Sequence, residues 1–445
     1  MSSEKKLVVA PWFYKTWLLL VDPIAYMQEI AKLGDFVKVR GVLGFYLVNH
    51  PELIKLVSKD KNDNINRDNI IYNRLKGVSR TGLVTSEGEY WQKQRRTMNP
   101  LFTPRTVKSF IDKMVAASLL RVDHWEKLCD SGEVFNASKE MDRLTLEING
   151  ACLFNANLKH VYDDLQKSFD YINRYMEMIP LPIISESWFP SPSNIKLKRT
   201  VKKVDIYIDS LIAERKGNLD DHDDFLTALM RAKDEETGES MPDWAVRHEV
   251  LVAFIAGYET ASTALCWAWY HLHDNPDVEE KLIAELTDVL GDRVPTLEDI
   301  PKLAYTKMFA EEVLRISPSA WLNGKTTVEN DEYWGEKIPG KSLMMIILPC
   351  IHHHQRYWDD PEKFMPERFL PDSVKARDPF AYVPFGGGPH VCLGKHFALQ
   401  ELIIGIAVLA KRFKLVVEPD FKPVASAGIS TAPKYPFMVR AQRRT

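Results

Sequence analysis

The feature that most constrains this chain is a glycine-rich turn near the C-terminus, which carries one cysteine and runs directly into an apolar helical stretch. The turn reads Phe385-Gly-Gly-Gly-Pro-His-Val-Cys-Leu-Gly394, and the stretch continues as KHFALQELIIGIAVLAKRF. The start of a helix offers free backbone N–H groups and a positive dipole end, and both favour the anionic form of Cys392. We therefore expect the turn to present a thiolate to a metal centre.

Glycine lacks the side chain that would block a close approach of the backbone to another group. We expect Gly386, Gly387, Gly388 and Gly394 to let the turn lie against a flat cofactor. Phe385 is expected to pack against the same cofactor on the sulfur side and to keep water away.

The order FxxGxxxCxG is typical of the cytochrome P450 superfamily of haem-thiolate monooxygenases, and this chain resembles that family. Three further motifs follow in the family's order and spacing, so the resemblance extends from about residue 20 to the end. It implies a mainly α fold with small β-sheets, in which haem b lies between a long central helix and the cysteine loop. Because the motifs must converge on one cofactor, we expect residues 1–445 to form a single domain. The segment Phe36–Pro51 predicts two short strands around a Gly-containing turn, and the C-terminal pieces FKLVVEP and PFMVRAQ predict two more strands.

Composition fits an enzyme with a large core, because 45% of the residues are hydrophobic and 27% are charged. The net charge of −3 gives no reason to expect nucleic-acid binding. Residues 1–20 are expected to be an N-terminal extension in which Trp12, Phe13 and Trp17 pack against the body of the protein. Their apolar runs are shorter than the roughly 20 residues of a membrane span, so we expect a soluble, prokaryotic, cytoplasmic protein.

The five cysteines are odd in number and widely spaced, and no CxxC pair occurs. This pattern argues against a disulfide framework and fits a reducing compartment. Apart from Cys392, the cysteines lie in apolar stretches of the sequence. We expect Cys129, Cys152, Cys266 and Cys350 to be ordinary buried residues.

The second motif, Ala256-Gly-Tyr-Glu-Thr260, lies in a segment without internal proline between Pro242 and Pro276. A helix of that extent would be on the order of 45 Å long, enough to cross the molecule, and its apolar sides predict a central position. Gly257 costs such a helix roughly 1 kcal/mol relative to alanine. Two explanations remain open: close packing of a neighbouring helix, or a local opening beside the iron where oxygen binds.

By the resemblance, the end of this motif delivers protons during oxygen activation. Reductive activation of O2 needs two protons at the distal oxygen, and a carboxylate, an alcohol and water can relay them. We therefore expect Glu259 and Thr260 to be catalytic residues, and Ala256 and Gly257 to contact the cofactor.

The third motif is Glu312-Val-Leu-Arg315, whose two charged residues share one helix face. The resemblance implies that Arg368, in the later segment Pro366-Glu-Arg-Phe369, joins them in a buried triad. Such networks often add little net stability. We expect the triad to fix the segment that leads into the cysteine loop and to take no part in catalysis.

The fourth motif is Trp91-Gln-Lys-Gln-Arg95, which places the indole N–H and the guanidinium on one helix face. Haem carries two propionates, which need hydrogen-bond donors and positive charge. The resemblance implies that Lys325 and His390 are further propionate ligands, at positions where the family usually has arginine. A lysine is a point charge and cannot form the planar fork of arginine.

By family analogy, five places line the substrate pocket, and their residues are mostly apolar. They are the segment near Ile70–Leu75, the turn Met178–Phe189, Ala253 with Phe254, the segment Ala320-Trp321-Leu322, and the loop around Gly428 and Ile429. The expected substrate is therefore a lipophilic small molecule, and a fatty acid, a terpenoid or steroid, and an aromatic metabolite all remain open. Arg67 or Arg74 is a candidate anchor for a substrate carboxylate.

The resemblance implies that electrons come ultimately from NAD(P)H through a separate carrier, a ferredoxin or flavodoxin with its reductase, because this chain carries no flavin or iron–sulfur domain. Five basic residues flank the thiolate-side motifs, and they form either a docking patch for an acidic carrier or an ordinary solvated surface. They are Lys93, Arg96, Lys395, Lys411 and Arg412.

Three alternatives to an O2-dependent monooxygenase remain open. The first is a haem-thiolate isomerase or dehydratase, although such family members tend to lack the acid–alcohol pair of Glu259 and Thr260. The second is a peroxygenase or decarboxylase that uses peroxide. The third belongs to another class, a non-catalytic haem-binding sensor.

Overall fold

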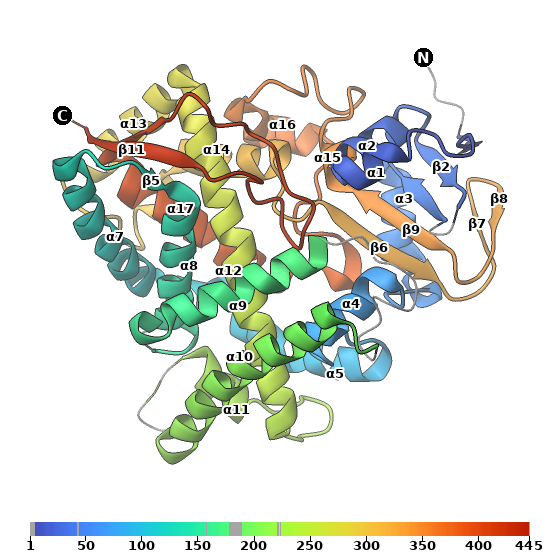
Figure 1. The fold of residues 1–445 in the computed structure, drawn as a ribbon, viewed down its shortest axis with the longest axis horizontal. Coiled ribbons are helices and arrows are strands. Elements are labelled where there is room, and N and C mark those ends of the chain that lie inside the picture. Colours follow the sequence, from blue (N-terminus) through green and yellow to red (C-terminus); the bar gives the residue numbers. More distant parts are fainter. Residues whose placement is uncertain are drawn as a thin grey trace.

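Helices make up most of this fold, and small sheets lie at its two sides (Figure 1). The computed structural model describes residues 5–41, 44–156, 158–177, 189–219, 222 and 224–444. The predicted class, mainly α with small β-sheets, is confirmed.

The larger sheet contains six strands among the described residues, in the spatial order β1-β2-β3-β9-β6-β4. They are β1 (Leu7–Val9), β2 (Phe36–Val39), β3 (Phe45–Val48), β4 (Ile65–Asn66), β6 (Leu322–Thr327) and β9 (Leu343–Ile347). β2 and β3 pair in antiparallel fashion, with Phe36 opposite Val48, which confirms the hairpin predicted around residues 36–51. β6 and β9 are also antiparallel and place Lys325 opposite Met344.

Two smaller sheets complete the β-structure of the described residues. One has the order β10-β11-β5 and the other pairs β7 with β8. Their strands are β5 (Phe135–Asn136), β7 (Asp331–Tyr333), β8 (Glu336–Ile338), β10 (Phe413–Val417) and β11 (Met438–Arg443). The antiparallel pairing of β10 with β11 confirms the two strands predicted near the C-terminus.

Several helices begin at a capping side chain. Asn69 accepts hydrogen bonds from the backbone N–H groups of Ile71 and Tyr72 before α4, and Ser191 accepts one from Asn194 before α10. The helices are α1 (Trp17–Val21), α2 (Pro23–Ala31), α3 (Pro51–Lys55), α4 (Ile70–Ser79), α5 (Gly88–Met98), α6 (Pro104–Lys108), α7 (Ile111–Ser131), α8 (Ala137–Leu153), α9 (Tyr162–Glu177), α10 (Pro192–Gly217), α11 (Phe225–Arg231), α12 (Asp243–Asp274), α13 (Pro276–Leu290), α14 (Ala304–Ile316), α15 (Leu348–His352), α16 (Pro371–Ala376) and α17 (Lys395–Ala410).

The long helix predicted between Pro242 and Pro276 is α12, which runs through the middle of the molecule (Figure 1). Its 32 residues span roughly 48 Å at 1.5 Å per residue. It packs against α8, α14 and α17. Among the described residues, α12 is the one helix long and apolar enough to cross a membrane, but 67% of its most apolar window is buried inside the protein. It is therefore a core helix.

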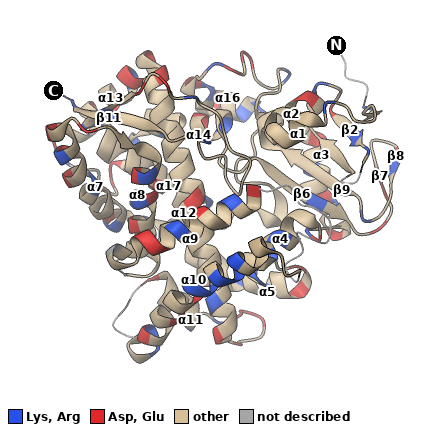
Figure 2. Cartoon of the chain, viewed as in Figure 1, with Lys and Arg blue, Asp and Glu red and all other residues tan. Residues whose placement is uncertain are grey.

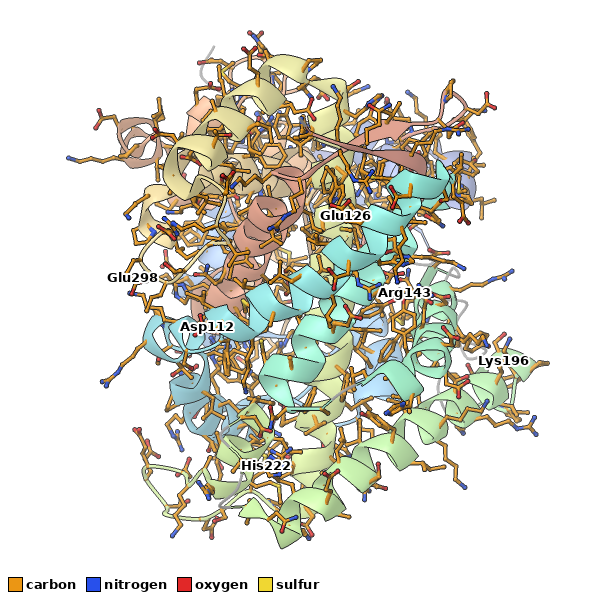
Figure 3. All side chains as sticks on the ribbon, turned by 90° about the vertical axis from the view of Figure 1, so that its left-hand side faces the viewer. Asp112, Glu126, Arg143, Lys196, His222 and Glu298 are labelled. Atoms are coloured by element: carbon orange, nitrogen blue, oxygen red, sulfur yellow. The ribbon has the colours of Figure 1, made fainter. Side chains whose placement is uncertain are left out.

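The core surrounds α12, and most charged side chains lie outside it. Figure 3 shows Asp112, Lys196 and Glu298 at the surface, and all three are exposed. All five cysteines are free, and Cys152, Cys266 and Cys350 are buried. Cys129 is partly buried and packs against the same core.

The N-terminal segment differs from the prediction in two respects. Residues within the expected extension form β1, which pairs with β2 at the edge of the larger sheet. The aromatic side chains do not pack against the body, because Trp12, Phe13 and Trp17 are 62%, 79% and 63% exposed. α1 has only five residues and is apolar all round, so one face alone can reach the core, and Leu18 and Leu19 occupy that face.

The structure brings Glu312, Arg315 and Arg368 together. Arg315 Nε and Nη2 donate to the two Glu312 carboxylate oxygens at 2.7 and 2.8 Å, and both side chains are fully buried. Arg368 Nε lies 3.4 Å from Glu312 Oε1. Arg315 also donates to the carbonyl oxygens of His352 and Pro361. These bonds join α14 to the segment that precedes the cysteine loop.

Replacement of Glu312 by alanine is expected to destabilise the protein by roughly 3–5 kcal/mol, because it leaves the Arg315 guanidinium buried without its counter-ion. Urea unfolding followed by circular dichroism measures this change. Glu362→Ala is the matched control, since the Glu362 side chain is 81% exposed and pairs only with His353. Equal losses for the two variants would contradict a structural role of the triad.

Candidate active site

A cavity of about 390 Å³ lies between α12 on one side and the cysteine loop with α17 on the other. α12 lines it with Glu249, Val252 and a run of small residues, which are Ala253, Ala256, Gly257, Thr260, Ala261 and Ala264. The opposite wall includes Phe385, Cys392, Gly394 and Phe397. A slot with one wall of small side chains suits a flat group.

The cysteine loop closes on itself and turns its sulfur toward this cavity. The backbone N–H of Cys392 donates to Phe385 O at 2.9 Å, and α17 begins at Lys395, two residues after Leu393. Cys392 is exposed to this cavity, and desolvation by the protein around it raises the pKa of its thiol. The backbone N–H of Gly394 and the positive charges of Arg95 and Lys395 act on this pKa in the opposite direction. The loop thus offers one thiol to whatever fills the slot.

The glycines of the loop serve two purposes. Gly388 has φ +68°, and a Cβ there would lie 1.8 Å from Ser58 O, in the turn η1 (Leu56–Asp60). A Cβ on Gly387 would lie 3.0 Å from the Phe380 ring. These two glycines admit neighbouring protein and not a cofactor, contrary to the prediction. The space beside Gly394 is open, with no protein atom within 4 Å of a Cβ placed there.

Positive charge gathers at one end of the cavity, where α4, α5 and β6 meet. Arg67 and Arg95 line the cavity there, and Lys325, on β6, is only 1% exposed. Burial and the nearby charge of Arg67 lower the pKa of Lys325 to about 8. Burial and the charges of Arg67, Lys325 and Arg95 lower the pKa of His390 to about 2. The three cations and the His390 imidazole therefore lie close enough to affect one another electrostatically.

The predicted propionate ligands lie together at this end. The Trp91 and His390 rings lie 4.1 Å apart between centroids, and both residues line the cavity. Within the part of the chain that the structure describes, no hydrogen bond or ion pair engages the side chain of Arg95 or of Lys325. Arg67 alone has a carboxylate partner, Glu87, at 2.6 Å. The donors and uncompensated charge fit a flat group that bears two carboxylates, as haem does.

Thr260 faces the cavity from the opposite wall. Its hydroxyl donates to Ala256 O at 2.7 Å, and α12 continues without interruption through Gly257. A Cβ on Gly257 would lie 3.0 Å from Oδ1 of Asn149 on α8. Of the two explanations that the sequence left open for this glycine, the structure shows close packing of a neighbouring helix.

Glu259 points away from the cavity, unlike its neighbour Thr260. Its carboxylate accepts a hydrogen bond from Ser430 Oγ at 2.7 Å. Burial, together with the negative charge of Asp142, raises the pKa of Glu259 to about 8. Adjacent residues on a helix point about 100° apart, and here that step carries the Glu259 side chain to Ser430, away from the cavity that Thr260 lines.

The expected pocket residues divide into two sets. Ala253, Ala320 and Leu322 line the cavity, as does Tyr72 from the segment near Ile70–Leu75. Phe254, Trp321 and Ile429 do not. Of the turn Met178–Phe189, residues 178–188 lie outside the described residues.

The three expected pocket residues that do not line the cavity contact other parts of the protein. The Phe254 ring stacks on Phe154 at 4.2 Å between centroids. Trp321 lies between two cavity residues in extended chain, so its side chain takes the opposite side, where its indole N–H donates to Gly428 O. Ile429 is held by a hydrogen bond from its backbone N–H to Asn173 Oδ1.

The two candidate carboxylate anchors are engaged by protein. Besides its bond to Glu87, Arg67 donates to Ser86 O at 2.8 Å. Arg74 donates to Tyr175 O. These bonds leave Arg67 at the cationic end of the cavity and hold Arg74 against α9.

The five basic residues proposed for carrier docking do not form one uniform patch. Lys93 pairs with Glu239, and Arg96 pairs with Asp234 and Glu236. Lys395 and Lys411 stand at opposite ends of α17, roughly 24 Å apart along its axis. Figure 2 shows Lys and Arg gathered instead along α10.

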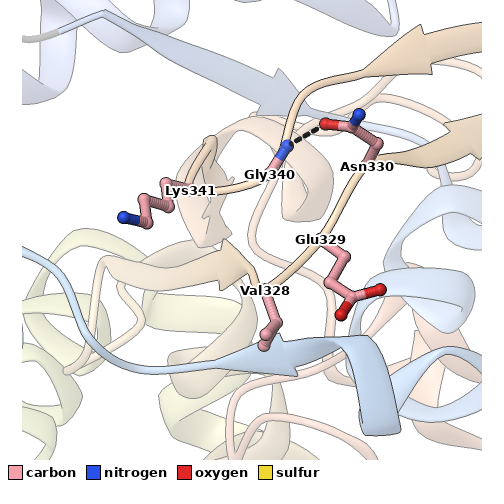
Figure 4. Close-up of a pocket in the computed structure, with 5 residues that line it drawn as sticks. All are labelled: Val328, Glu329, Asn330, Gly340 and Lys341. Carbon is pink, nitrogen blue, oxygen red and sulfur yellow. Dashed lines mark hydrogen bonds between the residues drawn. The ribbon is translucent and has the colours of Figure 1, made fainter.

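A second hollow lies at the edge of the larger sheet, beside the loop that follows β6 (Figure 4). Val328, Glu329, Asn330, Gly340 and Lys341 line it, and the Gly340 N–H donates to Asn330 Oδ1. Its lining is largely exposed and brings no nucleophile or group of acids together, so we place no reaction there.

Sequence reasoning missed several polar residues of the cavity, among them Glu249, Asn323 and the two described next. Asn149, on α8, and Glu401, on α17, both line the cavity and are fully buried. Each is a polar residue among apolar neighbours, in LEINGACLF and in LQELIIGI. That contrast is the signal in the sequence that could have found them.

Comparison with known proteins gives one family. A family model described as cytochrome P450 matches residues 25–439. The chain is 29% identical to cyclooctat-9-en-7-ol 5-monooxygenase of Streptomyces melanosporofaciens, over 91% of this chain and 88% of that protein. It is 27% identical to pentalenene oxygenase of Streptomyces avermitilis, over 93% of this chain and 92% of that protein.

A solved structure shows the same fold. The crystal structure of the cytochrome P450DA haem domain superposes with a TM-score of 0.88 at 22% identity, covering 99% of this chain and 98% of that chain. The chain therefore belongs to the cytochrome P450 family. It is a monooxygenase of that family, whose cofactor is haem.

Replacement of Lys325 by methionine is expected to stabilise the haem-free protein near pH 7 by roughly 3 kcal/mol, because it removes a buried charge without a counter-ion. The pKa of Lys325 falls from its usual 10.5 to about 8 in the folded protein. Between these two pH values the unfolded wild-type chain binds more protons than the folded one. The free energy of unfolding of the wild-type protein therefore rises with pH, and its difference from that of Lys325→Met disappears. Urea unfolding near pH 7 and near pH 10 measures this.

The same replacement is expected to weaken haem binding, measured by transfer of haem to a competing apoprotein. Lys414→Met is the control, since Lys414 is 43% exposed and paired with Glu279. If haem-free Lys325→Met were less stable than haem-free wild-type protein at both pH values, this would contradict our conclusion that Lys325 is a buried charge without a counter-ion.

Proposed function

We propose that this cytochrome P450 binds haem b through Cys392 and hydroxylates or epoxidises a cyclic terpenoid. The observation that carries this proposal is one cavity that joins a free thiol, near the start of a helix, to an end where the buried Lys325 and the half-buried Arg95 lack a carboxylate partner among the described residues. When bound, haem supplies the activation of O2 with two electrons and two protons.

The residues at the cationic end hold the cofactor in this proposal. Arg95 and Lys325 supply positive charge to the propionates, and Trp91 and His390 supply N–H donors. Phe385 and Gly394 lie on the sulfur side, where Phe385 restricts water. Desolvation raises the pKa of the free thiol, so the cations and the metal together stabilise the thiolate.

Thr260 is the proton-handling residue of the cavity wall in this proposal. Its hydroxyl can accept a hydrogen bond from water while it donates to Ala256 O, as it does in the structure. We propose that it passes protons to the oxygen side through water. Glu259, hydrogen-bonded to Ser430, takes no direct part from its present position.

The substrate class follows from the lining and from the relatives. Apart from the polar groups named above, the distal lining is apolar and includes Leu83, Val252, Ala253 and Ala320. The relatives named above are a pentalenene oxygenase and a cyclooctat-9-en-7-ol monooxygenase. We propose a rigid, largely apolar ring compound of this type, held chiefly by burial of its surface.

Electrons reach the haem from a separate ferredoxin or flavodoxin with its reductase, and ultimately from NAD(P)H, in this proposal. We place the protein in the cytoplasm as a soluble enzyme, in keeping with its five free cysteines.

Reconstitution of the purified protein with haem, a ferredoxin, its reductase and NADPH tests the proposed function. Cyclic terpenes that shift the ferric spin state are expected to give a product that carries one oxygen atom from O2. Product formed from hydrogen peroxide, and none from O2 with the carrier, would instead indicate a peroxygenase. Haem uptake without any turnover would indicate a sensor.

Replacement of Cys392 by serine is expected to abolish the thiolate-type spectrum of the reduced carbonyl complex, because serine supplies oxygen and not sulfur. The absorption spectrum of the reduced protein with carbon monoxide measures this. Cys350→Ser, at a buried cysteine, is the control and should keep the wild-type spectrum. A thiolate-type spectrum in Cys392→Ser would rule out Cys392 as the ligand.

Replacement of Thr260 by alanine is expected to retain substrate binding but to divert reducing equivalents to hydrogen peroxide, because proton delivery is impaired. A loss of roughly 10²-fold in coupled turnover is in the range of one positioned acid–base group. Product, NADPH and peroxide are measured together. Thr263→Ala, whose hydroxyl bonds to Ser430 away from the cavity, is the control. Unchanged coupling would remove Thr260 from the relay.

A further inference from the structure

Asn149 is the least explained polar residue in the core. It lies on α8 with 0% exposure. Both Oδ1 and Nδ2 of its carboxamide are buried without a hydrogen-bond partner among the described residues. A buried polar group without a partner is costly, and native proteins usually supply one in the form of protein, ligand or ordered water. This amide therefore requires a partner of another kind.

The partner must come from the central cavity, because Asn149 lines it. Its amide stands over Gly257, where a Cβ would be 3.0 Å from Oδ1 and 3.2 Å from Nδ2. Thr260 is three residues further along α12, and Cβ positions so related are about 5–6 Å apart. The amide and the Thr260 hydroxyl are thus close enough for one or two water molecules to connect them.

Glu401 is a second buried polar residue whose side chain lacks a hydrogen-bond partner among the described residues. It lies on α17, is 0% exposed and lines the same cavity, and neither of its carboxyl oxygens has a partner among the described residues. Figure 1 shows α8 and α17 together on one side of α12, and α4, α5 and β6 on the other. The unpartnered amide and carboxyl therefore come from two helices that contact each other, and both line the same cavity.

Burial favours the neutral form of the Glu401 carboxyl. Burial raises its pKa well above the usual range, and no other charge contributes. A neutral carboxyl can donate as well as accept a hydrogen bond, and so can a carboxamide. Together they offer donors and acceptors to water on two sides, which is what an ordered water needs.

We propose that Asn149 is a positioning residue for oxygen activation, whose carboxamide holds water between the Glu401 carboxyl and the Thr260 hydroxyl. The amide gains and loses no proton: Nδ2 donates to one water molecule and Oδ1 accepts from another. The water carries the proton. This inference rests on the proposed role of Thr260, and it gives that hydroxyl a polar neighbour in place of Glu259, which points away.

Gly257 has a specific purpose under this proposal. Any larger residue would displace the Asn149 amide, since a Cβ at 3.0 Å from Oδ1 is closer than ordinary van der Waals contact. Gly257 is therefore required at the point where α8 brings the Asn149 side chain to the cavity. Under this proposal, water reaches Thr260 without a local opening of α12.

The test uses Asn149→Leu in the haem-loaded protein, which keeps a branched side chain of the same number of heavy atoms and removes both hydrogen-bonding atoms. The share of reducing equivalents lost to peroxide is expected to rise roughly fivefold, as for the loss of one ordinary hydrogen bond. The solvent isotope effect on O2 consumption should rise with it, while substrate affinity from spin-state titration stays unchanged. Thr145→Val is the matched control, since Thr145 is a buried polar residue on the same helix that bonds to Met141 O.

A high-resolution crystal structure of the haem-loaded protein gives a readout independent of turnover. Ordered water within hydrogen-bond distance of the Asn149 amide is expected, and its loss in Asn149→Leu. An amide without water, or unchanged peroxide release in Asn149→Leu, would overturn the proposal.

A second variant covers the case in which Asn149→Leu fails to fold or to take up haem. Asn149→Ser leaves room for water and retains a hydroxyl, and it is expected to release less peroxide than Asn149→Ala. Equal release from the two would count against the proposal. Failure of the proposed function is distinguishable, because wild-type protein would then form no product from O2.

Discussion

The burial of α12 between α8, α14 and α17 is the constraint on which the other features of this protein depend. Once the helix is fixed in the core, its 100° step per residue decides which side chains reach the cavity. Thr260 faces inward, Glu259 bonds to Ser430 on another side, and Phe254 stacks on Phe154. The small residues of the inward face leave the slot, and Gly257 admits Asn149 from α8.

Positive charge at one end of the slot links the fold to its cofactor. Arg95 and Lys325 are held by the scaffold without a carboxylate partner in the described residues, and the lowered pKa of Lys325 expresses the cost of that burial. A ligand that brings two carboxylates removes this cost and stabilises the folded chain by mass action. Folding and haem binding are coupled for this reason, and the protein is prepared for an anionic partner before it binds one.

The elements of the fold were largely predictable because they rest on local patterns. The proline-free segment between Pro242 and Pro276 predicted α12. The two strand-like runs around a Gly-containing turn in residues 36–51 predicted the β2–β3 hairpin. The packing of Trp12, Phe13 and Trp17 was predicted wrongly. For Trp17 the reason is that α1 is short and apolar all round, so the sequence gives no sign of which face is buried. The roles of Gly387 and Gly388 were also misassigned, because a need for close approach does not reveal what approaches, and here it is Phe380 and Ser58.

The sequence by itself determined the family, the cysteine in its turn, the long helix and the candidate ligands, because each depends on residue types at fixed local spacing. Only the tertiary structure decided which of these side chains meet. It separated Glu259 from Thr260, excluded Trp321 from the cavity between two residues that reach it, and brought Asn149 and Glu401 to the same space. The physical reason is that spacing along the chain sets the direction of a side chain relative to its own element, whereas the packing of elements determines what lies in that direction.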